Sequence, residues 1–349
     1  MGELDVFCFG FQVDRTNGTG KRLQSTGSPA KIRTMTTSIP RRTKLSIIGS
    51  GAVGTAAAHW AVARSVADEI VLLDVVKGVP QGKALDMAQS APLCGYHGRI
   101  CGSNDYADTA DSDVVIITAG LARKPGMSRE DLLAQNVGIV RSVTEAVAER
   151  SPDACLVVVT NPIDAMVYTA FKVSGFPRNR VVGMAGVLDS ARYRTFIAER
   201  LGVSPVDVSA LVMGIHGDHM LPLVRLATVG GVPLSDLLSN EEIDEIIRRT
   251  QHGGAEIVEH LKTGSAFTTP GLSAVEMAQA ILKDEKRVMP CAVHLDGEFG
   301  VSGFFLGVPV VLGAGGVERI LEFRLTLEEE KALARSVEAV KRQVAVTGF

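Results

Sequence analysis

The stretch Leu45-Ser-Ile-Ile-Gly-Ser-Gly-Ala-Val-Gly54 decides the fold of this chain. Its apolar beginning predicts a buried parallel strand. Gly49, Gly51 and Gly54 then match the G-x-G-x-x-G pattern of a strand-to-helix turn that binds a dinucleotide. In this pattern the first glycine allows a tight turn, the second lets the backbone approach a pyrophosphate, and the third lets the following helix pack close to its strand.

A helix and an acidic residue complete the pattern. The alanine-rich run 52–64 predicts a helix whose first amides, including those of Ala52 and Val53, favour an anion. Asp74 ends the next apolar run, where a carboxylate can accept hydrogen bonds from the ribose hydroxyls of an adenosine. The same carboxylate repels a 2′-phosphate, so the expected cofactor is NAD rather than NADP. A glycine fingerprint alone also fits an ordinary turn, but the strand, helix and acid at these offsets favour dinucleotide binding.

The composition fits a globular protein of two domains. The 349 residues are 46% hydrophobic and 21% charged, which is near the average for globular chains. A net charge of −3 gives no support for nucleic-acid binding, and no apolar stretch approaches the length of a membrane span. The five cysteines form no C-x-x-C pair, which predicts reduced thiols and a cytoplasmic location.

Residues 1–42 differ in composition from the rest. They carry seven Lys or Arg and three Asp or Glu, are rich in Gly, Ser and Thr, and show no sustained periodicity. We expect this extension to be mostly disordered. Two alternatives are an organellar transit peptide, against which the early acidic residues argue, and translation that begins at Met35, which we favour.

From Thr43 onward, apolar strands alternate with helices. The predicted strands are 44–49, 69–75, 113–118, 154–159 and 180–184, and the predicted helices between them are 52–64, 80–90, 129–149 and 162–174. This alternation predicts an α/β fold with a Rossmann-type doubly wound parallel sheet, and we expect it to form an NAD-binding domain over residues 43–185.

The pattern changes after residue 186 to that of an α+β domain. The predicted helices are 187–202, 240–262, 271–284 and 326–345, and the extended segments are 208–215, 221–229, 287–294 and 307–312. Thr326-Leu-Glu-Glu329 is a capping-box signature for the last helix. We expect residues 186–349 to form a substrate-binding and catalytic domain.

Two polar segments follow predicted strands and therefore lie at the carboxyl edge of the sheet, where ligands bind in open α/β folds. In the loop 119–129, Arg123 and Arg129 can clamp an anionic substrate when the loop closes, although a solvated basic loop is the alternative for this segment alone. Asn161 can hydrogen-bond cofactor and substrate. Pro162 beside it also fits a helix start, and the two roles are compatible.

Two further segments carry groups suited to proton transfer. Asp189 and Arg192 lie three residues apart on a predicted helix and share a face, where a simple ion pair is the alternative. His216 ends an apolar run, where a packed core histidine is the alternative. Together, a histidine that moves a proton, a carboxylate that fixes its tautomer and an arginine that binds a carboxylate suffice for NAD to oxidise a 2-hydroxy acid.

Five motifs resemble those of NAD-dependent malate dehydrogenases of the lactate-dehydrogenase-like type. They are the glycine fingerprint, ARKPGMSRxDLLxxN, TNPxD, GVLDSARYR and GxHGD, which occur in the family's order and spacing between about Lys44 and Gln343. The resemblance implies that His216 accepts the proton with Asp189 as its partner and that Arg192 binds the C1 carboxylate.

The resemblance also implies the remaining binding residues. Asn161 would bind the substrate oxygen near the nicotinamide, Arg129 would polarise the C2 oxygen, and Arg123 would bind the distal carboxylate. The implied cofactor-binding residues are Gly49, Gly51, Ala52, Val53, Gly54, Asp74, Asn136, Thr160 and Asn161. Members of the family are usually homodimers or homotetramers, and no metal site is expected here because the histidines lack ligand spacing.

The expected activity is therefore reversible, NAD-dependent oxidation of (S)-malate to oxaloacetate. A lactate dehydrogenase on the same framework is the first alternative, and Arg123 argues against it because a lactate enzyme of this kind carries an uncharged residue there. The second alternative is a catalytically silent NAD-binding module. It predicts the loss of at least one of His216, Asp189, Arg192 and Arg129, and all four are present. Ile215 and His219 depart from the family pattern without removing a catalytic group.

Overall fold

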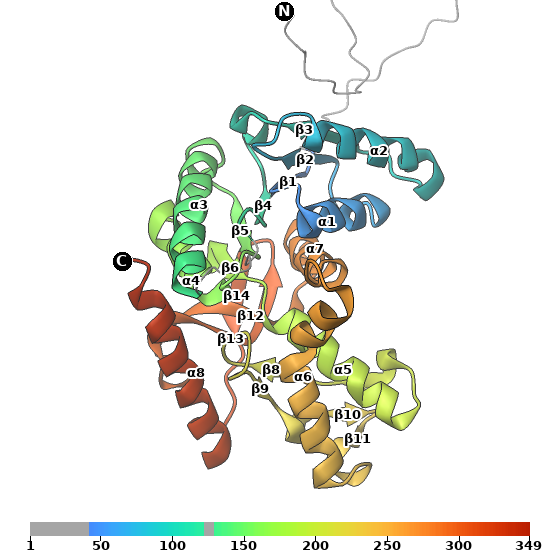
Figure 1. Cartoon of the computed structure of the whole chain (residues 1–349), viewed down its shortest axis with the longest axis vertical. Coiled ribbons are helices and arrows are strands. Elements are labelled where there is room, and N and C mark those ends of the chain that lie inside the picture. Colours follow the sequence, from blue (N-terminus) through green and yellow to red (C-terminus); the bar gives the residue numbers. More distant parts are fainter. Residues whose placement is uncertain (1–41, 122–128) are drawn as a thin grey trace, which may run out of the picture.

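A nine-stranded sheet forms the centre of the molecule (Figure 1). The computed structural model describes residues 42–121 and 129–349, so the predictions for residues 1–41 and for Arg123 lie outside the described residues. Six strands of the sheet run parallel in the order β3-β2-β1-β4-β5-β6. They are β1 Lys44–Ile48, β2 Glu69–Leu73, β3 Arg99–Ser103, β4 Val114–Ile117, β5 Cys155–Val158 and β6 Val181–Gly183. This strand order is that of a Rossmann-type doubly wound sheet.

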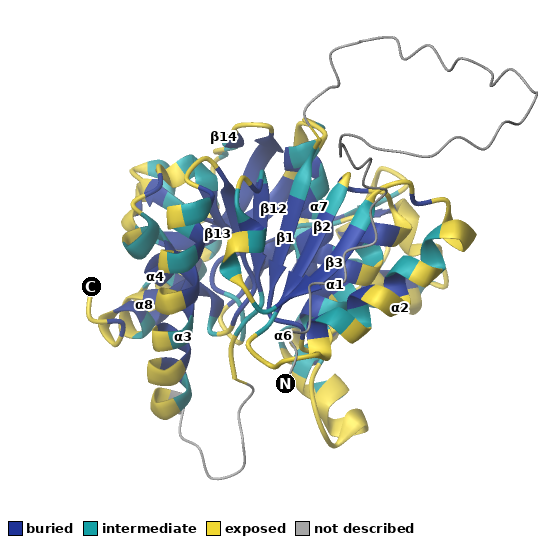
Figure 2. Cartoon of the chain, turned by 90° about the horizontal axis from the view of Figure 1, so that it is seen from above, coloured by how far each residue is buried: buried dark blue, intermediate teal, exposed yellow. Residues whose placement is uncertain are grey.

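Helices cover both faces of the sheet, which confirms the predicted fold class. On one face lie α1 Ala52–Ala63, α2 Val79–Cys94 and α7 Thr268–Leu282, and on the other lie α3 Arg129–Arg150, α4 Ile163–Ser174 and α8 Leu327–Ala345. The strands are buried between them (Figure 2). Because both faces are covered, β2 and β4 are almost wholly apolar rather than alternating.

The second half of the chain extends the same sheet, which the sequence did not predict. Strands β12 Arg287–Asp296, β13 Ser302–Gly313 and β14 Gly316–Ile320 add to it in antiparallel order, and β12 joins β6 where Ala292 pairs with Gly183. The segments 287–294 and 307–312 were expected in a separate α+β domain. The pairing of strands more than a hundred residues apart leaves no local trace in a single sequence, so the continuous sheet could not be read from it.

The remaining strands are short and were predicted only in part. The segments 208–215 and 221–229 contain the two-residue strands β7 Val208–Ser209, β8 Val212–Met213, β9 Leu221–Pro222 and β10 Thr228–Val229, and β11 is Val232–Pro233. Strand β3 was not predicted, because its sequence Arg-Ile-Cys-Gly-Ser has neither an apolar run nor a clean alternation.

Helices α5 Gly186–Leu201 and α6 Asn240–Leu261 pack together beside the sheet. The predicted capping box at Thr326 and Glu329 starts α8, and a second one at Ser239 and Glu242 starts α6. No helix within residues 42–121 and 129–349 combines the length and the apolar character that a membrane crossing requires.

Candidate active site

The glycine-rich turn between β1 and α1 has the shape that its sequence predicts. Gly49 adopts φ +103°, a conformation that favours glycine. A Cβ atom at Gly54 would lie 1.8 Å from the carbonyl oxygen of Gly49, so only glycine fits there. Gly51 has open space around its Cα and caps α1, whose first turn contains no acidic residue. The turn therefore offers free main-chain amides at the positive end of a helix, which suits a pyrophosphate.

Asp74 lies beside this turn and also holds it in place. Its Oδ2 accepts hydrogen bonds from the Ser50 amide (2.6 Å) and the Ser50 hydroxyl (2.9 Å), and its Oδ1 accepts one from the Val76 amide (3.0 Å). Partial burial alone raises the pKa of Asp74, but the hydrogen bonds from Val76 and Ser50 outweigh burial and lower that pKa. The carboxylate is thus ionised, and Oδ1 keeps a lone pair for a ribose hydroxyl.

A cavity of about 750 Å³ connects these groups at the carboxyl edge of the sheet. Its wall includes Gly49, Gly51 and Asp74 together with apolar side chains of Ile48, Leu73, Val75, Val76 and Ile139. An apolar slot that ends in one carboxylate and a glycine-rich helix start fits the adenosine and pyrophosphate of NAD.

Two residues expected near the cofactor use their side chains to hold main chain. The amide of Asn136 is 1% exposed, accepts a hydrogen bond from the Leu121 amide (2.8 Å) and donates to the carbonyls of Leu121 (3.2 Å) and Asn161 (2.8 Å). The Thr160 hydroxyl donates to the Ala119 carbonyl (2.8 Å). These bonds fix the two loops that follow β4 and β5, so both residues position the edge of the site.

His216 and Asp189 meet although they are 27 residues apart in the chain. The Nδ1 atom of His216 lies 2.8 Å from Oδ2 of Asp189, which is in the first turn of α5 and only 1% exposed. The His216 side chain keeps one fifth of its surface exposed. With Nδ1 bonded to a carboxylate, the Nε2 atom is left to exchange a proton with a ligand.

The loop that carries His216 is fixed on two sides. Gly214 exchanges two main-chain hydrogen bonds with Gly307 of β13, at 2.8 and 3.1 Å. The Ser336 hydroxyl of α8 donates to the His219 carbonyl (2.6 Å), while the His219 side chain is exposed. The base is therefore held by contacts between segments that are far apart in the sequence.

The charges around His216 favour its protonated form. Burial by itself lowers the pKa of the imidazole, but the charge of Asp189, its hydrogen bond and the charge of Asp164 outweigh burial and the repulsion from Arg192, so the pKa is raised. An imidazole whose cation is stabilised in this way is suited to accept a proton.

Arg192 lies one turn after Asp189 on α5 and contacts it. Its Nη1 atom is 3.5 Å from Oδ1 of Asp189, and its side chain is 13% exposed. Burial lowers the pKa of Arg192, and Asp189 opposes that shift, so the guanidinium stays charged. The sequence reasoning missed its neighbours Gly253 and Gly254 of α6, where a Cβ would lie 3.4 and 3.6 Å from atoms of the Arg192 side chain.

A cavity of about 680 Å³ opens beside His216. Asn161 lines it from the start of α4, and Glu130 of α3 and Arg342 of α8 line it from the other side. Asn161 is exposed, and the bond between Asn161 and Pro162 is cis. The side chains of Arg123 and Arg129 lie outside the described residues, although Arg129 begins α3.

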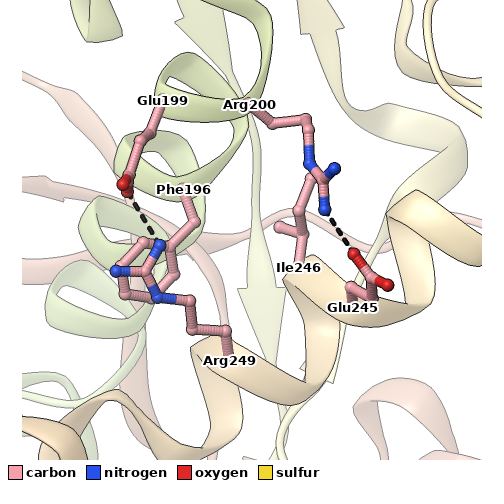
Figure 3. Close-up of a pocket in the computed structure, with 6 residues that line it drawn as sticks. All are labelled: Phe196, Glu199, Arg200, Glu245, Ile246 and Arg249. Carbon is pink, nitrogen blue, oxygen red and sulfur yellow. Dashed lines mark hydrogen bonds and ion pairs between the residues drawn. The ribbon is translucent and has the colours of Figure 1, made fainter.

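Another cavity, of about 420 Å³, lies between α5 and α6 (Figure 3). Arg249 of α6 places its guanidinium 4.1 Å from the centre of the Phe196 ring and 2.8 Å from a carboxylate oxygen of Glu199, while Arg200 of α5 pairs with Glu245. These contacts join α6 to the helix that carries Asp189 and Arg192. The described residues contain no cluster of three or more His, Cys, Asp or Glu that could hold a metal ion.

A doubly wound sheet with a glycine-rich cofactor turn, next to a histidine–aspartate pair and an arginine, defines an NAD-dependent dehydrogenase. The chain matches the family "lactate/malate dehydrogenase, NAD binding domain" over residues 43–183 and "lactate/malate dehydrogenase, alpha/beta C-terminal domain" over residues 186–347. The chain therefore belongs to the lactate/malate dehydrogenase family, and NAD is its cofactor.

Similar proteins include both activities of the family. A malate dehydrogenase from Desulforudis audaxviator is 56% identical over 301 residues, which are 86% of this chain and 97% of the relative. The structure of malate dehydrogenase from Salinibacter ruber is 51% identical with a TM-score of 0.84 and covers 87% of this chain and 97% of that one. The structure of a lactate dehydrogenase from Cryptosporidium parvum, complexed with lactic acid and β-nicotinamide adenine dinucleotide, is 45% identical with a TM-score of 0.86. The match covers 89% of this chain and 99% of that one. The fold alone does not separate the two substrates.

Proposed function

We propose that this chain is a malate dehydrogenase that interconverts (S)-malate and oxaloacetate, with His216 as the proton acceptor. The observation that carries the proposal is the 2.8 Å contact between His216 and a buried Asp189, with Arg192 on the same helix. NAD, when bound, accepts the hydride from C2 of the substrate. The protein supplies the proton acceptor, the carboxylate binding and the exclusion of water.

His216 takes the proton of the C2 hydroxyl at Nε2. Asp189 receives the hydrogen bond from Nδ1, which fixes the tautomer of the imidazole and stabilises the imidazolium that forms. In the reverse direction the same imidazolium returns the proton to the oxygen of oxaloacetate. The raised pKa of His216, which the charge of Asp189 and its hydrogen bond maintain against burial, means that the imidazolium formed in the oxidation is stabilised.

Arg192 binds the C1 carboxylate through two parallel hydrogen bonds. Its guanidinium is buried, charged and held by Asp189, and the small residues Gly253 and Gly254 leave space beside it. Asn161 lines the same cavity as His216 and donates to the substrate oxygen. These contacts place C2 and its hydroxyl at the base.

The choice of malate over lactate rests on Arg123, and Arg129 serves both substrates. Oxaloacetate carries a second carboxylate that pyruvate lacks, and its enclosure needs a cation. Arg123 lies six residues before Arg129 in the sequence, and the family resemblance implies that both side chains contact the substrate. The many malate dehydrogenases among the relatives support this assignment.

Replacement of Arg123 tests the proposal. Arg123→Gln should lower kcat/KM for oxaloacetate by at least about tenfold, since a charge-assisted hydrogen bond contributes about 1.5–3 kcal/mol. The value for pyruvate should rise or stay the same. Arg129→Gln is the matched control, and it should depress turnover with both substrates because they share the C2 oxygen. Equal losses for both substrates in Arg123→Gln would remove the main support for malate.

We also propose a homo-oligomer, a dimer or a tetramer, in the cytoplasm. The thiols of Cys94, Cys155 and Cys291 are free, which fits a reducing compartment. Light scattering coupled to size-exclusion chromatography would measure the number of subunits, and a monomeric mass would contradict the assembly.

A further inference from the structure

Asp164 is a buried carboxyl group next to the base that the mechanism above does not use. It lies in the first turn of α4 and is 1% exposed. Its Oδ2 atom accepts the main-chain N–H of His216 at 3.4 Å. Its Oδ1 atom has no hydrogen-bond partner among the described residues. In the sequence, Asp164 is the acidic residue of the TNPxD motif.

A negative charge at this buried position is costly. Burial, which is the largest effect, raises the pKa of Asp164 to about 7, while the charge and main-chain N–H of His216 lower it. An asparagine would accept the His216 N–H equally well without the desolvation cost of a carboxylate. The nearby group that a negative charge here favours is the imidazole of His216, whose pKa the charge of Asp164 helps to raise.

We propose that Asp164 is a positioning residue for the reaction: it anchors the backbone of His216, and its charge adds to that of Asp189 in favouring the imidazolium. This inference rests on the proposed role of His216 as the proton acceptor. The two carboxylates act from different elements, Asp189 from α5 on the ring nitrogen and Asp164 from α4 on the main chain. The imidazolium formed when malate loses its proton is thus stabilised from two directions.

Other charged groups lie near the base on several elements. Arg192 of α5 opposes protonation of His216, whereas Asp189 and Asp164 favour it. Asp218 and His219 of the His216 loop, Glu130 of α3 and Arg342 of α8 line the adjoining cavity. Among these groups, Asp164 alone combines complete burial with a hydrogen bond to the backbone of His216.

The pKa of the His216 imidazole in the apo-protein tests the inference. It is measured by ¹H–¹⁵N NMR titration, with the His216 signal assigned from its loss in His216→Asn. Asp164→Asn keeps the acceptor but removes the charge, and it should lower this pKa by about one unit. Thr169→Val is the matched control on α4, because the buried Thr169 hydroxyl bonds to the Ala165 carbonyl of its own helix, and it should leave the pKa unchanged. An unchanged imidazole pKa in Asp164→Asn would overturn the inference.

Two further measurements keep the test decisive. If Asp164→Asn fails to fold, the wild-type titration of His216 decides, because the inference requires an imidazole pKa above its usual value and a pKa at or below that value overturns the inference. In the active enzyme, Asp164→Asn should move the pH profile of kcat/KM for malate to lower pH, since the base is then neutral at lower pH. The NMR titration needs no substrate, so it tests the inference independently of activity. A protein without malate activity would refute the proposed function, whereas the pKa of His216 would still decide the role of Asp164.

Discussion

The cofactor turn and the proton-transfer cluster are built in opposite ways. The turn is one contiguous segment, Gly49 to Gly54, and its shape comes from the backbone conformation of its glycines. The cluster joins His216, Asp189 and Asp164 from a loop and two helices, and its geometry comes from contacts that cross the molecule. Binding of the cofactor is therefore encoded mostly in one contiguous segment, which Asp74 holds through Ser50, whereas the chemistry depends on contacts between distant segments.

The largest expected effect comes from a substitution that removes the base and leaves the cofactor turn intact. His216→Asn should reduce kcat by about 10²–10⁴, the usual contribution of a general base, with unchanged affinity for NADH. Stopped-flow or steady-state turnover, together with NADH fluorescence titration, measures the two quantities separately. His97→Asn, at an exposed histidine, is the control. Turnover of His216→Asn near the wild-type value would show that another group accepts the proton.

The second effect is on the free energy of unfolding, and it reports the cost of burying the carboxylate of Asp164. Asp164 has a pKa of about 7 in the folded chain and an ordinary value of 3.8, so the folded state binds more protons between these values and loses stability as pH rises through that window. The Asp164→Asn variant has no carboxyl group at this position, so it does not lose this stability as the pH rises. From pH 5 to pH 8 its free energy of unfolding should therefore gain about 2–3 kcal/mol relative to wild type, at about 1.4 kcal/mol per pKa unit. Urea unfolding at both pH values measures the gain, and a constant difference would mean that Asp164 titrates normally.

The third effect separates folding from binding within the turn. Gly54→Ala places a Cβ 1.8 Å from the Gly49 carbonyl and should destabilise the protein by about 1–3 kcal/mol. Gly51→Ala meets no atom within 4 Å, so its melting temperature should stay close to wild type. Its affinity for NADH should nevertheless fall, by about tenfold, because the added methyl group stands where a pyrophosphate approaches. Normal affinity of Gly51→Ala would place the pyrophosphate elsewhere.

The smallest effect concerns the choice of nucleotide. Asp74→Ser removes the charge that repels a 2′-phosphate, so the ratio of kcat/KM for NADH over NADPH should fall by about tenfold. Because Asp74 also holds Ser50, some loss with NADH itself is expected. Steady-state kinetics with both nucleotides measures the ratio, and an unchanged ratio would argue against the assigned role of Asp74.

The sequence predicted the cofactor half of the molecule more completely than the catalytic half. Strand β1 and helix α1 lie within one or two residues of their predicted ends, because apolar runs and glycines act locally. The sequence also placed His216 and Asp189 among the site residues, and their chemistry and the family resemblance paired them, although no local pattern spans 27 residues.

The parts that sequence reasoning missed depend on distant contacts. The extension of the sheet by β12 to β14, the buried charge of Asp164 and the space at Gly253 beside Arg192 are all set by packing between segments far apart. A signal for Asp164 was present in the sequence, since an acidic residue stands within the otherwise apolar start of α4. Its partner could be found only in three dimensions.

The most direct test of the account is the oxidation of NADH by the wild-type enzyme with oxaloacetate and with pyruvate under the same conditions. The account predicts that kcat/KM for oxaloacetate exceeds that for pyruvate by at least about tenfold, because a cation at Arg123 is satisfied only by the second carboxylate. It also predicts that the oxaloacetate activity is lost in His216→Asn. A kcat/KM for pyruvate equal to or above that for oxaloacetate would contradict the account.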